Sequence, residues 1–184
     1  MEIIFWILII LAAILVIMFI TYFNKFVILG NRIDNSLAQI DVQLKKRADL
    51  VPNLIEIVKG YVKHETAMIE KVTEARKALL SAKDITSKVK AGDKLQGALK
   101  TIFALAESYP NLKANENFLQ LQQELSAIED KVAYSRQFYN DSILNYNNST
   151  QIFPGNVFAS IFGKSKKEFL HITGAERATP KIKF

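Results

Sequence analysis

The chain has 184 residues, of which 49% are apolar, and 24 lysines and arginines outweigh 18 aspartates and glutamates to give a formal charge of +6. That length and apolar fraction suit one domain with a buried core. Because cysteine is absent, disulfide-stapled folds, thiolate zinc sites and cysteine nucleophiles are excluded. The 7 glycines and 4 prolines are too few for a strand-and-turn protein, so an all-α fold is predicted.

Residues 3–23 (IIFWILIILAAILVIMFITYF) form an uncharged apolar run. As an α-helix the run is about 31 Å long, which matches the hydrocarbon thickness of a bilayer. A cleaved signal peptide is one alternative, but the run is long, only Met1 and Glu2 precede it, and no small-residue cleavage site follows. A buried core helix is another, and it would need apolar neighbours on every side. We therefore predict a transmembrane anchor over residues 1–23.

The charges that flank the anchor predict its orientation. Glu2 is the only side-chain charge before the run, whereas several basic residues follow it. Because basic flanks favour the cytoplasmic side, we expect a single-pass protein of the inner (cytoplasmic) membrane with its N-terminus outside and its C-terminal domain in the cytoplasm. The flanking basic residues are Lys25, Arg32, Lys45, Lys46 and Arg47.

Beyond the anchor, an apolar stripe with steps of three and four residues predicts one very long helix or two stacked helices. Pro52 either kinks a continuous helix or begins a new one capped by Asp49. We favour a kink, because the stripe keeps its phase across Pro52. Between the membrane and Leu44 the stripe is expected to extend beyond the shorter helices, and uncovered apolar surface seeks partner subunits. The stripe comprises Leu29, Ile33, Leu37, Ile40, Leu44, Val51, Leu54, Val58, Val62, Ile69, Val72 and Leu79.

The rest of the chain is predicted to form a loop and further helices. Residues 81–93 are the most loop-like stretch, and a helix fits residues 94–108 before Tyr109-Pro110-Asn111 ends it. A longer helix is expected from an N-cap at Asn115 to about Ser149. A short helix over 156–162 would end at Gly163. Because these helices carry apolar stripes, we predict an antiparallel helical bundle over residues 24–162. The stripe of the longer helix comprises Phe118, Leu121, Leu125, Ile128, Val132, Ser135, Tyr139, Ser142 and Tyr146.

Residues 163–184 form a basic tail that carries +4 of the net charge. We interpret it as a solvated, flexible segment. Attraction to anionic lipid is the alternative, with Phe162, Phe169, Leu170 and Phe184 as apolar partners. Nucleic-acid binding is not expected, because the tail lacks interleaved aromatic residues. The candidate lipid contacts are Lys164, Lys166, Lys167, Lys181 and Lys183.

Sequence motifs for catalysis are missing. The chain has no Gly-rich phosphate loop and no G-x-S-x-G elbow, and it lacks the two Glu-x-x-His motifs on facing helices that di-iron bundles need. His64-Glu65 lacks the second histidine of a helical zinc protease motif, so a solvated or packed histidine is expected rather than a metal ligand. We therefore expect a non-enzymatic protein without metal or cofactor.

Two polar constellations stand out. Tyr139-Asn140 and Tyr146-Asn147 repeat after seven residues, which places both tyrosines on one helix face and both asparagines beside it. Arg47 and Asp49 cannot pair on a regular helix, so each is expected to need a partner from another helix, among Glu124, Glu129, Arg136 and Asn140. A buried network that sets the bundle register is our preferred interpretation, and a partner-binding groove is the alternative. The candidate network comprises Arg47, Asp49, Asn53, His64, Glu65, Arg136, Tyr139, Asn140, Tyr146 and Asn147.

At these residues the sequence resembles the bacterial LemA family. The resemblance covers nearly the whole chain after the membrane run, up to Gly163. It implies a single-pass protein with a very short outer N-terminus, a mostly α-helical cytoplasmic domain, and no assigned activity or cofactor. The matching blocks are Arg47-Ala-Asp-Leu-Val-Pro-Asn-Leu54, Val58-Lys-Gly-Tyr61, His64-Glu65, Ala75-Arg76, Glu107-Ser-Tyr-Pro-Asn-Leu-Lys-Ala114, Asn117-Phe118, Leu121-Gln122, Glu124-Leu125, Arg136, Tyr139-Asn140, Tyr146-Asn147, Phe153-Pro154 and Phe162-Gly163.

Taken together, these features predict a membrane-anchored scaffold or adaptor that forms a homo-oligomer and recruits unidentified membrane or cytoplasmic proteins, without nucleic acid. A ligand receptor with a pocket around Arg47, His64, Tyr139 and Tyr146 is one alternative. Lipid binding or membrane remodelling through the basic tail is the other.

Overall fold

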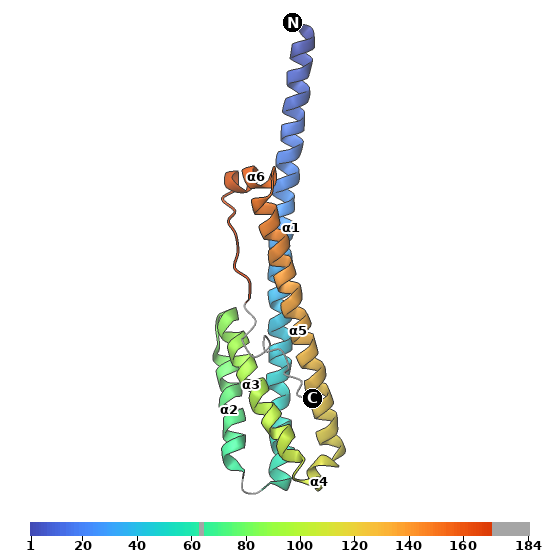
Figure 1. The fold of residues 1–184 in the computed structure, drawn as a ribbon, viewed down its shortest axis with the longest axis vertical. Coiled ribbons are helices and arrows are strands. Elements are labelled where there is room, and N and C mark those ends of the chain that lie inside the picture. Colours follow the sequence, from blue (N-terminus) through green and yellow to red (C-terminus); the bar gives the residue numbers. More distant parts are fainter. Residues whose placement is uncertain (63–64, 171–184) are drawn as a thin grey trace, which may run out of the picture. The chain divides into compact units, whose positions relative to one another are not determined.

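The structure, a computed structural model, describes residues 1–62 and 65–170. These residues are mostly helical, which confirms the predicted all-α fold (Figure 1). The chain divides into two compact units: Met1–Ser36 with the chain from Phe138 onward, and Leu37–Gln137. The helices are α1 (Glu2–Tyr61), α2 (Thr66–Ser81), α3 (Ile85–Ala106), α4 (Pro110–Lys113), α5 (Glu116–Gln151) and α6 (Gly155–Ile161), and α1 and α5 contribute to both units.

The first part of α1 is long and apolar enough to cross a membrane. An 18-residue window of this helix has a mean hydropathy of 3.4, and none of the window is buried. A core helix of a soluble protein would bury such side chains, because exposed apolar surface of this extent is costly in water. The exposed run therefore supports membrane association through the N-terminal helix.

In the unit that contains the anchor, α1 packs along the second part of α5. Phe26, Leu29 and Ile33 of α1 are buried, and Phe26 meets Tyr146 of α5 edge to face at 6.0 Å. The hydroxyl groups of Ser36 and Ser142 lie 3.3 Å apart. The expectation that the stripe before Leu44 lacks a cover is therefore wrong, because α5 is long enough to pack along it.

Helix α6 returns the chain against α1 in the same unit. Phe158 stacks on Tyr22 with ring centroids 4.8 Å apart. Gly155 permits the turn into α6, because a Cβ atom at this position would lie 2.3 Å from the carbonyl oxygen of Ser149. Gly163 ends the segment with a φ of +62°, a conformation that costs glycine little. The short helix predicted over residues 156–162 is thus confirmed as α6.

In the second unit, α2 and α3 form an antiparallel pair beside the later part of α1 and the first part of α5 (Figure 1). Helix α1 continues through Pro52 to Tyr61, so the alternative in which Pro52 begins a new helix is excluded. The predicted stripe is divided between two helices, as one of the two alternatives has it, but the first helix ends at Tyr61 rather than at Pro52, and α2 runs back along α1. The core includes Val51, Leu54, Leu95 and Leu112, none of which is accessible.

The largest secondary-structure error concerns residues 81–93, which were predicted as a loop. Helix α3 already begins at Ile85, and Asp84 caps it by accepting the Ser87 backbone N–H at 2.9 Å. The Ser87 hydroxyl also donates to the Asp84 carboxylate, at 2.6 Å, and this bond together with the backbone bond holds the pKa of Asp84 below its usual value. Although the segment is mostly polar, its residues Val89, Ala91 and Gly92 are buried in the bundle. Small residues allow such close packing without a strongly apolar pattern.

The prediction for α5 is confirmed. The Asn115 side chain accepts the Phe118 backbone N–H at 3.0 Å, as an N-cap does. Every member of the predicted α5 stripe is buried, because the 3.6-residue period places all of them on one helix face.

Candidate functional site

Asn140 and Asn147 of α5 hold an extended segment of the same chain in the anchor unit. The Asn147 amide donates to the Lys167 carbonyl oxygen at 2.9 Å and accepts the Lys167 N–H at 2.8 Å. The Asn140 amide makes the same pair of bonds to Leu170, at 3.1 Å and 2.9 Å. Each asparagine side chain therefore donates one hydrogen bond to the backbone of a tail residue and accepts one from it. We call these two residues the asparagine clamp.

The spacing of the clamp matches an extended peptide. Asn140 and Asn147 are two helical turns apart, about 10.5 Å along the axis of α5. Lys167 and Leu170 are three residues apart, about 10 Å in an extended chain. The seven-residue spacing of the two asparagines on α5 therefore matches the three-residue spacing of Lys167 and Leu170 in the extended tail.

Side chains reinforce this backbone pairing. Leu170 is buried, and the Lys167 ammonium lies 5.5 Å from the centre of the Tyr146 ring, which is within the range of a cation–π contact. Lys164, Lys166 and Lys167 are exposed, whereas Lys181 and Lys183 lie outside the described residues. The described part of the basic tail is therefore held on α5 and still presents its charges to the surroundings.

Tyr139 and Tyr146 fill the seam beneath the clamp, as the sequence predicted for their rings. Burial raises the pKa of both phenols, and the charge of Asp34 raises the pKa of Tyr139 further. Both rings therefore stay neutral at a pH at which an exposed tyrosine begins to ionise.

This pKa shift predicts a loss of stability in alkali. Tyrosines of the unfolded chain ionise near pH 10 and the two native ones at higher pH. Their contribution to stability is thus fully present below about pH 10 and is lost as the pH rises through the native pKa values. We expect the free energy of unfolding in urea to fall more steeply above this pH in the wild type than in a Tyr139→Phe, Tyr146→Phe variant. The exposed Tyr134→Phe is the matched control, and equal slopes in all three proteins would contradict the assignment.

A charged cluster occupies the core of the second unit. Arg47 is only 2% exposed and donates from Nη1 to the Gly92 carbonyl oxygen at 3.3 Å. Burial lowers the pKa of Arg47, the negative charge of Glu129 raises it, and Arg136 and Asp93 act with smaller opposing effects. Arg136 pairs with Asp93 at 2.5 Å. Arg47 thus has a carbonyl partner on α3 and the negative charge of Glu129 on α5, whereas Arg136 is a like charge that pairs with Asp93.

Several other predicted network members lie elsewhere. The expectation that Asp49 needs a partner from another helix is wrong, because Asp49 pairs with Lys45 on α1 at 3.4 Å, where both side chains are exposed. Asn53 is exposed, and Glu65 precedes α2 without a side-chain cap. Glu124 is also exposed and accepts a hydrogen bond from Gln120 of its own helix. Asn140 pairs with the tail rather than with Arg47 or Asp49, and His64 lies outside the described residues.

A hydrogen bond that the sequence does not predict replaces the one that Pro52 removes from α1. Proline has no N–H, so the carbonyl oxygen four residues earlier, that of Ala48, loses its helical donor. Arg76 of α2 donates from Nε to this oxygen at 2.7 Å. Ala48 is fully buried, and water therefore cannot replace the missing donor. A proline inside a predicted helix indicates that the carbonyl oxygen four residues earlier needs another donor, and this was the available signal for the Arg76 contact.

We expect Arg76→Met to destabilise the bundle by about 1.5–3 kcal/mol, the range for a hydrogen bond to a charged donor. In a Pro52→Ala background the restored N–H can satisfy Ala48, so the same substitution should cost clearly less. Urea unfolding of the four proteins of this double-mutant cycle measures the coupling. An equal cost of Arg76→Met in both backgrounds would show that Arg76 acts independently of Pro52.

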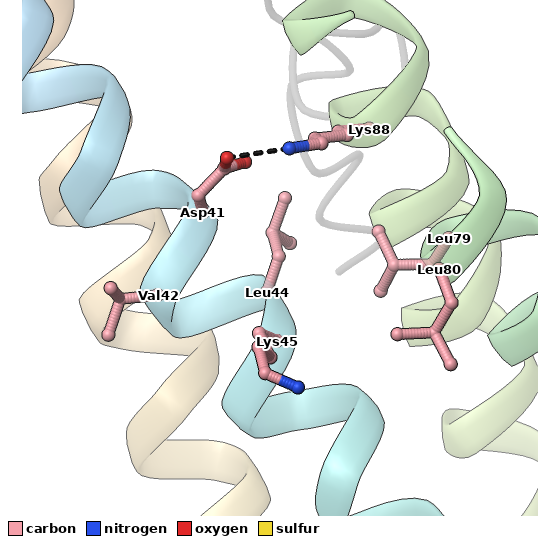
Figure 2. Close-up of a pocket in the computed structure, with 7 residues that line it drawn as sticks. All are labelled: Asp41, Val42, Leu44, Lys45, Leu79, Leu80 and Lys88. Carbon is pink, nitrogen blue, oxygen red and sulfur yellow. Dashed lines mark hydrogen bonds and ion pairs between the residues drawn. The ribbon is translucent and has the colours of Figure 1, made fainter. Parts of the chain in front are cut away.

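A groove of about 260 Å³ lies between α1, the end of α2 and the start of α3. Figure 2 shows the ion pair between Lys88 and Asp41 beside its aliphatic lining. The two charged groups are 2.6 Å apart. The lining contains Asp41, Val42, Leu44, Lys45, Leu79, Leu80 and Lys88, which provides no nucleophile paired with a base. Within residues 1–62 and 65–170, no three His, Cys, Asp or Glu side chains are grouped to hold a metal ion.

Comparison with known proteins gives consistent matches. The model of the LemA family matches residues 36–184, which extends beyond the pattern recognised up to Gly163. Protein LemA of Metamycoplasma hominis is 30% identical over 133 residues, covering 70% of this chain and 59% of that protein. Magnetosome protein MamQ of Magnetospirillum gryphiswaldense is 22% identical over 175 residues, covering 81% of this chain and 64% of MamQ. The chain thus spans roughly three fifths of the length of these relatives.

Proposed function

Because the chain belongs to the LemA family and begins with an exposed apolar helix, we propose that it is a single-pass, non-enzymatic scaffold of the cytoplasmic membrane. In this proposal the N-terminus lies outside and the helical bundle lies in the cytoplasm. The basic residues that follow the apolar run, beginning with the exposed Lys25, support this orientation. The names of the relatives state no reaction.

The observation that carries the proposal is the continuity of α1. One helix contains the apolar run and also residues of the bundle core, with no loop or linker between Glu2 and Tyr61. Pro52 does not interrupt it, and Arg76 supplies the donor that the proline removes. A partner that binds the bundle would therefore be tethered to the membrane through α1, as a scaffold requires.

We further propose that the scaffold self-assembles and also contacts membrane or cytoplasmic proteins. The apolar stripe of α1 is covered by α5 and does not support self-assembly. Val27 and Ile28 instead remain exposed on α1 just after the apolar run. Exposed aliphatic residues beside a membrane anchor suit contact with a second copy, since both copies are confined to the same plane.

The anchor and its orientation are tested in intact membranes. The full chain should stay in the pellet after a carbonate wash. A protease added from the cytoplasmic side should remove the bundle, whereas a protease added from outside should leave it intact. Release of the full chain by carbonate contradicts the anchor, and digestion from outside contradicts the orientation.

Self-assembly is tested with single cysteines, because the natural chain has none. Ile28→Cys should give a disulfide-linked dimer on mild oxidation in the membrane. Asp34→Cys, which is exposed on another face of α1, is the matched control. Equal cross-linking at the two positions indicates random collision and contradicts a specific contact.

A further inference from the structure

We propose that α6 is an interfacial helix that lies in the membrane surface beside the anchor, with its outer apolar face in the lipid. This inference rests on the proposed membrane anchor and adds a second lipid-binding element to it. The occupant of the α6 face is the bilayer, at the leaflet into which the C-terminal end of the apolar run leads.

The depth of α6 is set by its contacts with α1. The Phe162 ring, at the end of α6, packs edge to face on Phe19 at 4.9 Å and on Phe23 at 5.5 Å. Phe23 ends the apolar run and Phe19 lies one turn inside it. The contacts therefore place the end of α6 at the level where hydrocarbon gives way to headgroups, once the run spans the membrane. Aromatic residues are enriched at this level of membrane proteins.

The surface of α6 is divided into two stripes. Val157 and Ile161 are one turn apart and expose 48% and 61% of their surface. Asn156 and Ser160, each one residue earlier, are exposed on the neighbouring face. Because one residue turns a helix by 100°, the apolar and polar stripes face different directions. This is the pattern of a helix that lies at an interface.

Residues before α6 extend the apolar surface, and residues after it add positive charge. Ile152 and Phe153 are highly exposed, and a soluble protein would rarely leave these side chains next to Val157 and Ile161 in water. Lys164, Lys166 and Lys167 follow α6 and are exposed, with Glu168 as the one acidic residue among residues 162–170. Exposed lysines next to an apolar face favour a surface that carries anionic lipid.

The bilayer is a better occupant than a second protein copy, because the inner face of α6 already rests on the anchor. Phe158 and Phe162 attach it to Tyr22 and Phe23. The exposed stripe thus belongs to a helix that is attached to the anchor at Tyr22 and Phe23. Any anchor long enough to span the membrane brings this stripe into the interface without further assembly.

The test uses the full chain in phosphatidylcholine vesicles that contain phosphatidylglycerol, with one cysteine at a time carrying an environment-sensitive fluorophore. Val157→Cys and Ile161→Cys report on the apolar stripe, and Asn156→Cys and Ser160→Cys are their controls on the same helix. Ile14→Cys reports on the anchor itself, and Ala127→Cys, exposed on α5, reports on water. All these positions are exposed, so the labels do not disturb the core.

We expect a blue-shifted emission at positions 157 and 161, loss of quenching by iodide, and quenching by headgroup spin-labelled lipid. Positions 156 and 160 should retain more iodide quenching than 157 and 161. If position 14 reports lipid while 157 and 161 resemble position 127, the inference fails and the anchor stands. Protection of 157 and 161 from both quenchers indicates a protein cover and also overturns it. If position 14 is itself quenched by iodide, the anchor and the inference both fail.

Discussion

Replacing Asp93 with alanine should destabilise the bundle by about 3 kcal/mol, near the lower end of the range for breaking a buried ion pair. The carboxylate pairs with Arg136, and the two side chains are only 28% and 13% exposed. Its charge also acts on the buried Arg47. Without Asp93, Arg136 loses its carboxylate partner and the buried Arg47 loses a nearby negative charge, and neither guanidinium group can lose its proton. Urea unfolding of the full chain, followed by circular dichroism, measures the change.

Asp49→Ala is the matched control for Asp93, because it removes the same charge from an exposed pair with Lys45. Such a pair contributes about 0–1 kcal/mol. Replacing both partners, with Asp93→Leu and Arg136→Met, should recover much of the loss, since well-packed apolar residues can substitute for a buried pair. Similar effects of Asp93→Ala and Asp49→Ala would show that burial does not strengthen the Arg136–Asp93 pair.

The sequence predicts the helices well where a single helix carries its own signal. The α5 stripe, its N-cap at Asn115 and the short helix before Gly163 follow from local spacing and capping chemistry. The continuity of α1 through Pro52 also follows, because the stripe keeps its phase there. The loop prediction for residues 81–93 is wrong because this segment carries little apolar signal of its own. The residues that α3 buries here are Val89, Ala91 and Gly92, and they give a weak apolar pattern.

The partners of the polar residues could not be predicted, since they depend on which helices meet. The sequence singles out Arg47 and Asp49 as residues in need of partners and Arg136 as one candidate partner, but Asp93, which pairs with Arg136, lies within the predicted loop. Arg76 was recognised only as part of a family block, and its link to Ala48 requires the antiparallel return of α2. The Tyr-Asn repeat was noticed, whereas the tail backbone as its partner is a contact between residues 20 and 30 positions apart.

Replacing the asparagine clamp should release the tail with little effect on the remaining fold. Each clamp asparagine makes two hydrogen bonds to the tail, and a typical net contribution is about 1 kcal/mol per bond. Asn140→Leu with Asn147→Leu should therefore remove roughly 4 kcal/mol from the pairing of residues 167 and 170 with α5. Because the freed tail backbone can bond to water, global stability should fall by less. Amide hydrogen exchange at Lys167 and Leu170 is the measurement, since their N–H groups donate to the clamp.

The single variants make the prediction sharper. Asn147→Leu should abolish protection at Lys167 directly, while protection at Leu170 should decrease only through the lost cooperation between the two ends of the clamp. Asn148→Leu is the matched control, because Asn148 is exposed on the same helix. If the Lys167 amide stays protected in Asn147→Leu, contacts such as the buried Leu170 side chain hold the tail, and the side-chain amides do not. If Asn148→Leu also exposes Lys167, the loss reflects a weakened α5 rather than a broken clamp.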